Sequence, residues 1–159
     1  MGETLDRDRA WEEFLEVWCD LRERARSPGT VIVVEGERDR AALAALRIEG
    51  EVVALHRGQP LAHVAHRIAE RARTVVILTD WDTKGGQLAR RFRIFLEALP
   101  LTLDLESRRR LAKAVRGEVA HVEGLAGWSR RAADRAGTTV EAALDEAELG
   151  RRRRRRPTG

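Results

Sequence analysis

The sequence has one cysteine, no tyrosine and no long apolar run. Because Cys19 is the single cysteine, an internal disulfide bond and a zinc cluster built from cysteines are excluded. Without tyrosine, the chain cannot form a covalent intermediate through a tyrosine nucleophile. No apolar stretch reaches the length that a membrane-spanning helix needs, so we expect no membrane partner. Residues 1–20 carry seven acidic side chains and no apolar core. This composition does not fit a secretory signal, and we expect a cytoplasmic protein.

Positive charge is concentrated in the last nine residues. The formal net charge is +4 at pH 7, but Arg151–Arg156 supply six positive charges, so residues 1–150 carry a net charge of −2. The run of like charges, followed by Pro157, predicts a disordered tail at 151–159 because the charges repel one another. Candidates for contact with nucleic-acid phosphates are Arg151, Arg152, Arg153 and Arg154. A tail that only improves solubility is the alternative.

Strand-like and helix-like patterns alternate along most of the chain. Apolar and β-branched runs predict strands at residues 31–34, 51–55, 74–79 and 118–122. Apolar residues at helical spacing predict helices at residues 5–26, 37–47, 61–72, 85–98, 105–116, 125–135 and 139–149. This alternation predicts an α/β fold, in which a central parallel sheet of about four strands is flanked by helices and joined by right-handed crossovers.

The length of 159 residues fits one domain with additions at both ends. We divide the chain into an N-terminal amphipathic helix packed on the core (1–27), an α/β domain (28–126), C-terminal helices (127–150) and the arginine-rich tail (151–159). In the N-terminal helix, Trp11, Phe14 and Trp18 recur at helical spacing between acidic residues. A dimerisation helix is the alternative interpretation, so a homodimer or another protein partner stays open.

Acidic residues follow two of the predicted strands. The strand at 31–34 ends in Glu35, and the strand at 74–79 ends in Asp80 and Asp82. Ligands of parallel α/β sheets bind beyond the carboxyl ends of the strands, so we expect these three carboxylates to converge. Clustered carboxylates repel one another unless a cation lies among them, and Mg²⁺ prefers hard oxygen ligands. The sequence therefore predicts a metal-dependent phosphate site that binds Mg²⁺, with Mn²⁺ as a substitute.

These motifs resemble the Toprim domain, a metal-binding module of topoisomerases, bacterial-type primases, some nucleases and a family of ribonucleases that mature ribosomal RNA. The residues that carry the resemblance are Val33-Val34-Glu35-Gly36 with Asp39, and then Thr79-Asp80-Trp81-Asp82-Thr83-Lys84-Gly85. The resemblance covers residues 30–100 and extends to about residue 126. The chain is most similar to the small stand-alone Toprim proteins, many of them archaeal.

The resemblance implies a Rossmann-like Toprim fold and a role for each acidic residue. It implies that Glu35 is a general acid/base and that Asp80 and Asp82 bind Mg²⁺. We also count Glu35 among the candidate metal ligands. This sequence departs from the family pattern at Trp81, where small residues or proline are frequent, and we expect the indole to narrow the mouth of the site.

Further candidates surround these carboxylates. Lys84 is one of only two lysines, against 28 arginines, and we interpret it as a catalytic charge on phosphate, although a solvated loop lysine is the alternative. Asp39 is a candidate additional ligand or a partner of a ligand. Gly36 and Gly85 are candidates for a backbone loop around phosphate. Candidates for contact with nucleic acid on the following helix are Arg90 and Arg91. Among the histidines, His56 follows the second strand and could approach the site, whereas we expect His121 to be structural.

Three classes of function fit this sequence. The first is Mg²⁺-dependent phosphodiester chemistry on RNA or DNA, as a nuclease rather than by primase-like nucleotidyl transfer, because the chain has no cysteine-based zinc module. The second is a non-catalytic, metal-dependent module that binds nucleic acid. The third is phosphotransfer on a small phosphorylated substrate. The covalent reaction of topoisomerases is excluded because it requires a tyrosine.

Overall fold

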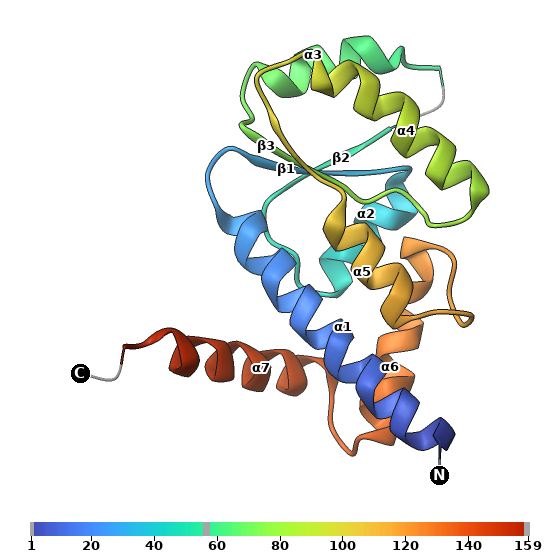
Figure 1. The fold of residues 1–159 in the computed structure, drawn as a ribbon, viewed down its shortest axis with the longest axis vertical. Coiled ribbons are helices and arrows are strands. Elements are labelled where there is room, and N and C mark those ends of the chain that lie inside the picture. Colours follow the sequence, from blue (N-terminus) through green and yellow to red (C-terminus); the bar gives the residue numbers. More distant parts are fainter. Residues whose placement is uncertain (1, 56–57, 158–159) are drawn as a thin grey trace.

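A four-stranded parallel sheet forms the centre of the molecule (Figure 1). The computed structural model describes residues 2–55 and 58–157, so His56 lies outside the described residues. The strands are β1 (Thr30–Val34), β2 (Glu51–Ala54), β3 (Thr74–Ile77) and β4 (Thr102–Asp104), in the spatial order β2-β1-β3-β4. Every neighbouring pair is parallel. The predicted α/β fold with a four-stranded parallel sheet is therefore confirmed.

The fourth strand was predicted in the wrong place. Residues 118–122 form no strand; they lead into the short 3₁₀ helix η1 (Val122–Gly124). The edge strand is β4 instead, which pairs with β3. β4 is only three residues long, too short to carry a clear strand pattern in the sequence. At its end, the Asp104 carboxylate accepts hydrogen bonds from the backbone N–H groups of Glu106 and Ser107 in the first turn of α5 (Glu106–Ala114).

Helices cover both faces of the sheet. In Figure 1, α3 (Leu61–Ala69) and α4 (Thr83–Glu97) lie on one face, and α1 (Gly2–Arg26), α2 (Glu37–Ala45), α5 and α6 (Leu125–Arg135) lie on the other. Alternate residues of β1 enter the two cores: Val31 and Val33 pack with α3 and α4, whereas Ile32 and Val34 pack with α1 and α6. Burial of both faces explains why the central strands are continuously apolar. Among the described residues, no helix has the length and apolarity needed to cross a membrane.

Four aromatic rings join α1 to α6. Trp11 and Phe14 stack with ring centroids 5.7 Å apart, and Phe14 stacks on Trp18 at 5.4 Å. The Trp128 ring of α6 meets Phe14 edge-on at 5.1 Å. Phe14 is fully buried at the centre of this cluster. The helix predicted at 5–26 therefore extends over residues 2–26 and carries much of the core on its face of the sheet.

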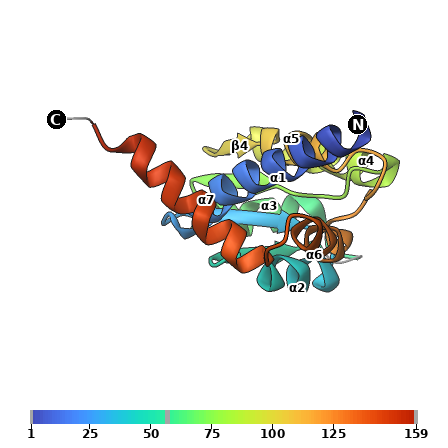
Figure 2. The same cartoon turned by 90° about the horizontal axis from the view of Figure 1, so that it is seen from below.

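The C-terminal helix differs from the expected disordered tail. α7 (Val140–Arg155) continues through five of the six consecutive arginines. Arg151 forms ion pairs with Asp20 and Glu23 of α1, and Arg155 pairs with Glu23. These acidic partners offset the repulsion between the arginines. The prediction of a disordered tail considered the repulsion but not the partners. Figure 2 shows α7 crossing α1, with its C-terminal end pointing away from the sheet.

We expect the substitution Phe14→Ala to lower the free energy of unfolding by about 3–5 kcal/mol, because it leaves a cavity among stacked rings. Urea denaturation followed by tryptophan fluorescence and circular dichroism measures this change. The control, Glu13→Ala, alters an exposed residue of the same helix and should change stability by no more than about 0.5 kcal/mol. Equal, small effects of the two substitutions would show that the cluster does not hold α1 on the core.

Candidate functional site

The carboxylates of Glu35 and Asp80 meet at the carboxyl edge of the sheet. Glu35 directly follows β1, and Asp80 lies three residues beyond β3, its neighbour in the sheet. The Oε1 atom of Glu35 accepts a hydrogen bond from the backbone N–H of Asp80 at 3.1 Å. The structure thus brings together two residues that are 45 positions apart in sequence.

Asp80 is nearly enclosed, with 8% of its surface exposed. Its Oδ1 accepts a hydrogen bond from the backbone N–H of Val122 at 2.8 Å. Its Oδ2 lies 3.3 Å from Nδ1 of His121. One carboxylate oxygen is therefore held by the backbone, while the other faces an imidazole.

Asp82 has a similar arrangement. It caps α4, and its Oδ1 accepts a hydrogen bond from the backbone N–H of Gly85 at 2.7 Å. Its Oδ2 lies 3.4 Å from the same Nδ1 of His121. The two aspartates would point to opposite faces of a continuous strand. They share one site because the chain turns after β3, where the Thr79 hydroxyl donates to the Gly85 carbonyl.

Gly85 allows the first turn of α4 to lie against these carboxylates. A Cβ atom at this position would lie 1.8 Å from the Asp80 carbonyl oxygen and 2.8 Å from Oε1 of Glu35. No side chain fits in this space. At Gly36 the situation differs, since a Cβ would meet only Oδ2 of Asp39, at 4.0 Å.

Asp39 lies one turn beyond Glu35 on α2. Its Oδ2 accepts a hydrogen bond from the Gly36 backbone N–H at 3.0 Å, and the residue is buried. Burial, and next the negative charge of Asp80, raise the pKa of the Asp39 carboxyl above its ordinary value. Asp39 thus adds negative charge to the site, and its role as an additional ligand stays a prediction.

Burial and like charges act on Glu35 in the same way. Burial is the larger cause and the Asp80 charge the second cause of a raised pKa of the Glu35 carboxyl, and the hydrogen bond from the Asp80 backbone opposes them. Asp82 and Asp39 raise this pKa further. The site therefore concentrates more negative charge than its own hydrogen bonds neutralise.

Sequence reasoning missed Arg108 of α5. Its Nε donates to the Thr79 carbonyl at 2.9 Å, and its Nη2 donates to the Asp80 carbonyl at 2.6 Å. Burial lowers the pKa of this guanidinium, and the charges of Glu35 and Asp80 oppose that effect. Nothing in the sequence distinguishes this residue from the other arginines, since its contacts depend on how α5 packs against α1.

The structure gives Trp81 and His121 contacts that were not predicted from the sequence. Trp81 is half-buried; its indole N–H donates to the Val119 carbonyl at 2.6 Å, and its backbone N–H donates to the Ala120 carbonyl at 3.2 Å. The indole thus holds residues 119–122 against the loop between β3 and α4 (residues 78–82), which we call the acidic loop. His121 was expected to be structural, but it is exposed and lies at both aspartates.

A cleft of about 820 Å³ opens beside the carboxylates. Six of the thirteen predicted site residues line it, together with His121: Glu35, Gly36, Asp39, Asp80, Lys84 and Arg91. Asp82 and Gly85 lie next to these residues but do not line the cleft. Lys84 and Arg91 come from α4 and provide positive charge next to the acidic residues. Four further candidates do not line this cleft: Arg151, Arg152, Arg153 and Arg154 belong to α7. Arg90 is exposed on α4 and does not line it either.

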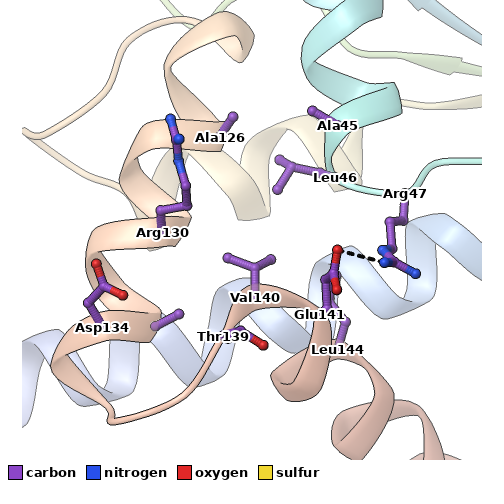
Figure 3. A pocket seen from close by; sticks show the side chains of 11 residues that line it. Ala45, Leu46, Arg47, Ala126, Arg130, Asp134, Thr139, Val140, Glu141 and Leu144 are labelled. Carbon is purple, nitrogen blue, oxygen red and sulfur yellow. Dashed lines mark ion pairs between the residues drawn. The ribbon is translucent and has the colours of Figure 1, made fainter.

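A second pocket, of about 570 Å³, lies between the end of α2, α6 and the start of α7 (Figure 3). Side chains such as Leu46, Val140 and Leu144 line it, and an ion pair of 2.6 Å joins Arg47 to Glu141 at its side. No predicted site residue lines this pocket.

The donor set suits a divalent cation. Asp80, Asp82 and His121 each offer one ligand atom, and these three atoms lie within 4.8 Å of one another. Carboxylate oxygens and an imidazole nitrogen are ordinary ligands of divalent ions in proteins. A divalent cation would also reduce the repulsion between the neighbouring carboxylates of Glu35, Asp80 and Asp82.

Comparisons with known proteins agree with the fold. The model of the Toprim domain matches residues 30–116. A UPF0292 protein of Thermococcus gammatolerans is 40% identical over 117 residues, which cover 74% of this chain and 84% of that protein. Another UPF0292 protein, of Methanosarcina barkeri, is 39% identical over 115 residues, or 72% of this chain and 78% of that one. A solved structure from Aquifex aeolicus aligns with a TM-score of 0.58 and 28% identity over 68% of this chain and 94% of that chain.

We expect Gly85→Ala to destabilise the protein by about 1–3 kcal/mol, because the new methyl group overlaps the backbone of Asp80. The neighbouring substitution Gly86→Ala is the matched control. There the nearest atoms to a new Cβ are the ends of two arginine side chains, at 3.7 and 3.8 Å, and alanine favours the helix by up to about 1 kcal/mol. Thermal denaturation of both variants measures the difference. Equal stability of the two variants would contradict the close packing at Gly85.

Proposed function

The chain belongs to the Toprim domain family, and from this we propose that it carries out Mg²⁺-dependent phosphodiester chemistry on nucleic acid, as a nuclease. The observation that carries the proposal is the convergence of Glu35, Asp80 and Asp82 beside one cleft. An acidic cleft repels the phosphates of nucleic acid unless a cation lies between them. A site that combines this acidity with a fold of phosphate-processing enzymes is suited to metal-dependent chemistry.

Asp80 and Asp82 would hold the metal ion through their Oδ2 atoms. Each residue uses Oδ1 for a backbone N–H, so both side chains are oriented before an ion binds. When bound, a divalent cation neutralises charge on phosphoryl oxygens and lowers the pKa of a coordinated water. The protein supplies the fixed carboxylates that orient this chemistry.

Glu35 is the residue that we assign to proton transfer. It lines the cleft, and the Asp80 backbone N–H fixes one of its two oxygens. A carboxylate held in this way can take a proton from an attacking water or return one to a leaving oxygen. Its position beside Asp80 supports a role in proton transfer next to the proposed metal.

Cationic residues of α4 fit the backbone of a nucleic acid. Lys84 and Arg91 both line the cleft. They lie seven positions apart on one helix, which is two turns or roughly 10 Å along its axis. Two cations at this spacing can contact phosphates along one strand. Their positive charge would also reduce the repulsion between those phosphates and the acidic residues of the same cleft.

A non-catalytic nucleic-acid-binding module is the second candidate, and the exposed end of α7 favours it. Arg152, Arg153 and Arg154 are exposed and do not line the cleft. They can bind phosphates without any metal ion. Binding through α7 alone would leave the cleft without a role in nucleic-acid contact.

We expect the double substitution Asp80→Asn, Asp82→Asn to reduce metal-dependent cleavage by about a hundredfold or more, since a metal ion supplies several kcal/mol of transition-state stabilisation. End-labelled RNA and DNA, each single- and double-stranded, are incubated with the protein over a Mg²⁺ titration. A triple Arg152, Arg153, Arg154→Gln variant serves as the control for binding by α7. Cleavage that persists in the double variant would contradict the proposed site. Binding without cleavage, lost only in the triple variant, would establish the second candidate instead.

We expect Glu35→Gln to slow cleavage by about 10²–10⁴-fold, the usual contribution of a general acid or base. The glutamine oxygen can still accept the Asp80 N–H, so the fold should be unchanged. Single-turnover cleavage at saturating Mg²⁺ measures the rate, and Glu13→Gln on α1 is the control. If Glu35→Gln cleaves as fast as the native protein, another group moves the proton.

A further inference from the structure

Each of residues 119–122 contacts the acidic loop. Val119 and Ala120 accept hydrogen bonds from the indole and backbone N–H groups of Trp81. The Val122 N–H donates to Asp80, and the His121 ring faces both aspartates. This segment lies beyond residues 30–116, which match the Toprim model. It therefore adds a side chain to the site from outside the matched region.

The three facing atoms have the spacing of ligands around one ion. Nδ1 of His121 lies 3.3 Å from Oδ2 of Asp80 and 3.4 Å from Oδ2 of Asp82. Adjacent ligands of an octahedral ion with bonds of about 2.1 Å are separated by roughly 3 Å. The third separation lies within 4.8 Å. Small side-chain rotations bring such a set onto one cation.

A structural role accounts poorly for His121. Its side chain is 57% exposed, so it contributes little to the apolar core. The backbone contacts of Val119, Ala120 and Val122 already attach the segment without the imidazole. The ring instead lies where Asp80 and Asp82, each held by a backbone N–H at Oδ1, present their Oδ2 atoms.

We propose that His121 is a metal ligand together with Asp80 and Asp82, and that its nitrogen makes this site prefer a first-row transition ion, with Mn²⁺ bound more tightly than Mg²⁺. This inference rests on the proposed metal-binding function of the two aspartates. Mg²⁺ prefers oxygen ligands and retains its waters, whereas transition ions gain more from an imidazole nitrogen. Replacement of the imidazole should therefore cost Mn²⁺ affinity and leave Mg²⁺ affinity nearly unchanged.

Mn²⁺ binding to the full chain tests the inference without any activity assay. Electron paramagnetic resonance of free Mn²⁺ gives the affinity, and electron spin-echo modulation detects nitrogen bound to Mn²⁺. Competition with Mg²⁺ gives the second affinity. The variants are His121→Gln, the double Asp80→Asn, Asp82→Asn, and His66→Gln. His66 is an exposed histidine of α3 and serves as the matched control.

We expect nitrogen modulation in the native protein and in His66→Gln, and its loss in His121→Gln together with a fall in Mn²⁺ affinity of roughly tenfold or more. The inference would be overturned if the native protein showed no nitrogen modulation, or if His121→Gln bound Mn²⁺ as tightly as the native protein. In either case, a loss of Mn²⁺ binding in the double aspartate variant would still support the metal site. Unchanged binding in the double aspartate variant would overturn the metal site and this inference together.

Discussion

The site depends on backbone N–H groups that each fix one oxygen of an acidic side chain. Four carboxylates follow this rule, and their donors are the backbone N–H groups of residues 36, 80, 85 and 122. Each hydrogen bond offsets part of the cost of gathering like charges at one edge of the sheet. It also removes the rotational freedom of the side chain, so the second oxygen has a defined direction. The acidic cluster is therefore oriented by the fold before any ligand arrives.

The sheet and its two cores make this arrangement rigid. β1 and β3 are buried on both faces, so the two ends that carry Glu35 and Asp80 are fixed in register. On one face the aromatic cluster of α1 and α6 holds the segment that precedes α6, and this segment includes His121. Packing far from the cleft thus determines where the imidazole lies. The same logic applies to Arg108, which reaches the acidic loop only because α5 packs against α1 and follows β4.

Much of the fold was predictable because the signals are local. Apolar, β-branched runs predicted three of the four strands correctly. The acidic residues that follow β1 and β3 predicted the carboxylates that the structure brings together. The edge strand β4 was missed because three residues carry too little periodicity. The helical end of α7 was missed because the repulsion among its arginines is visible in sequence, whereas the acidic partners lie more than 100 positions away. His121 and Arg108 were missed for the same reason, since only tertiary packing brings them to Asp80.

The contacts of residues 119–122 also show that the stretch matched by the family model is not the whole packed unit. A fragment that ended at residue 116 would contain the whole Toprim match. In that fragment Oδ1 of Asp80 would lose its donor, the Trp81 indole would lose its acceptor, and Phe14 would lose the ring of Trp128. The stretch that matches the family model is therefore shorter than the stretch whose side chains pack around Asp80 and Phe14. The residues that complete the hydrogen bonding of Asp80 therefore lie outside the stretch that matches the family model.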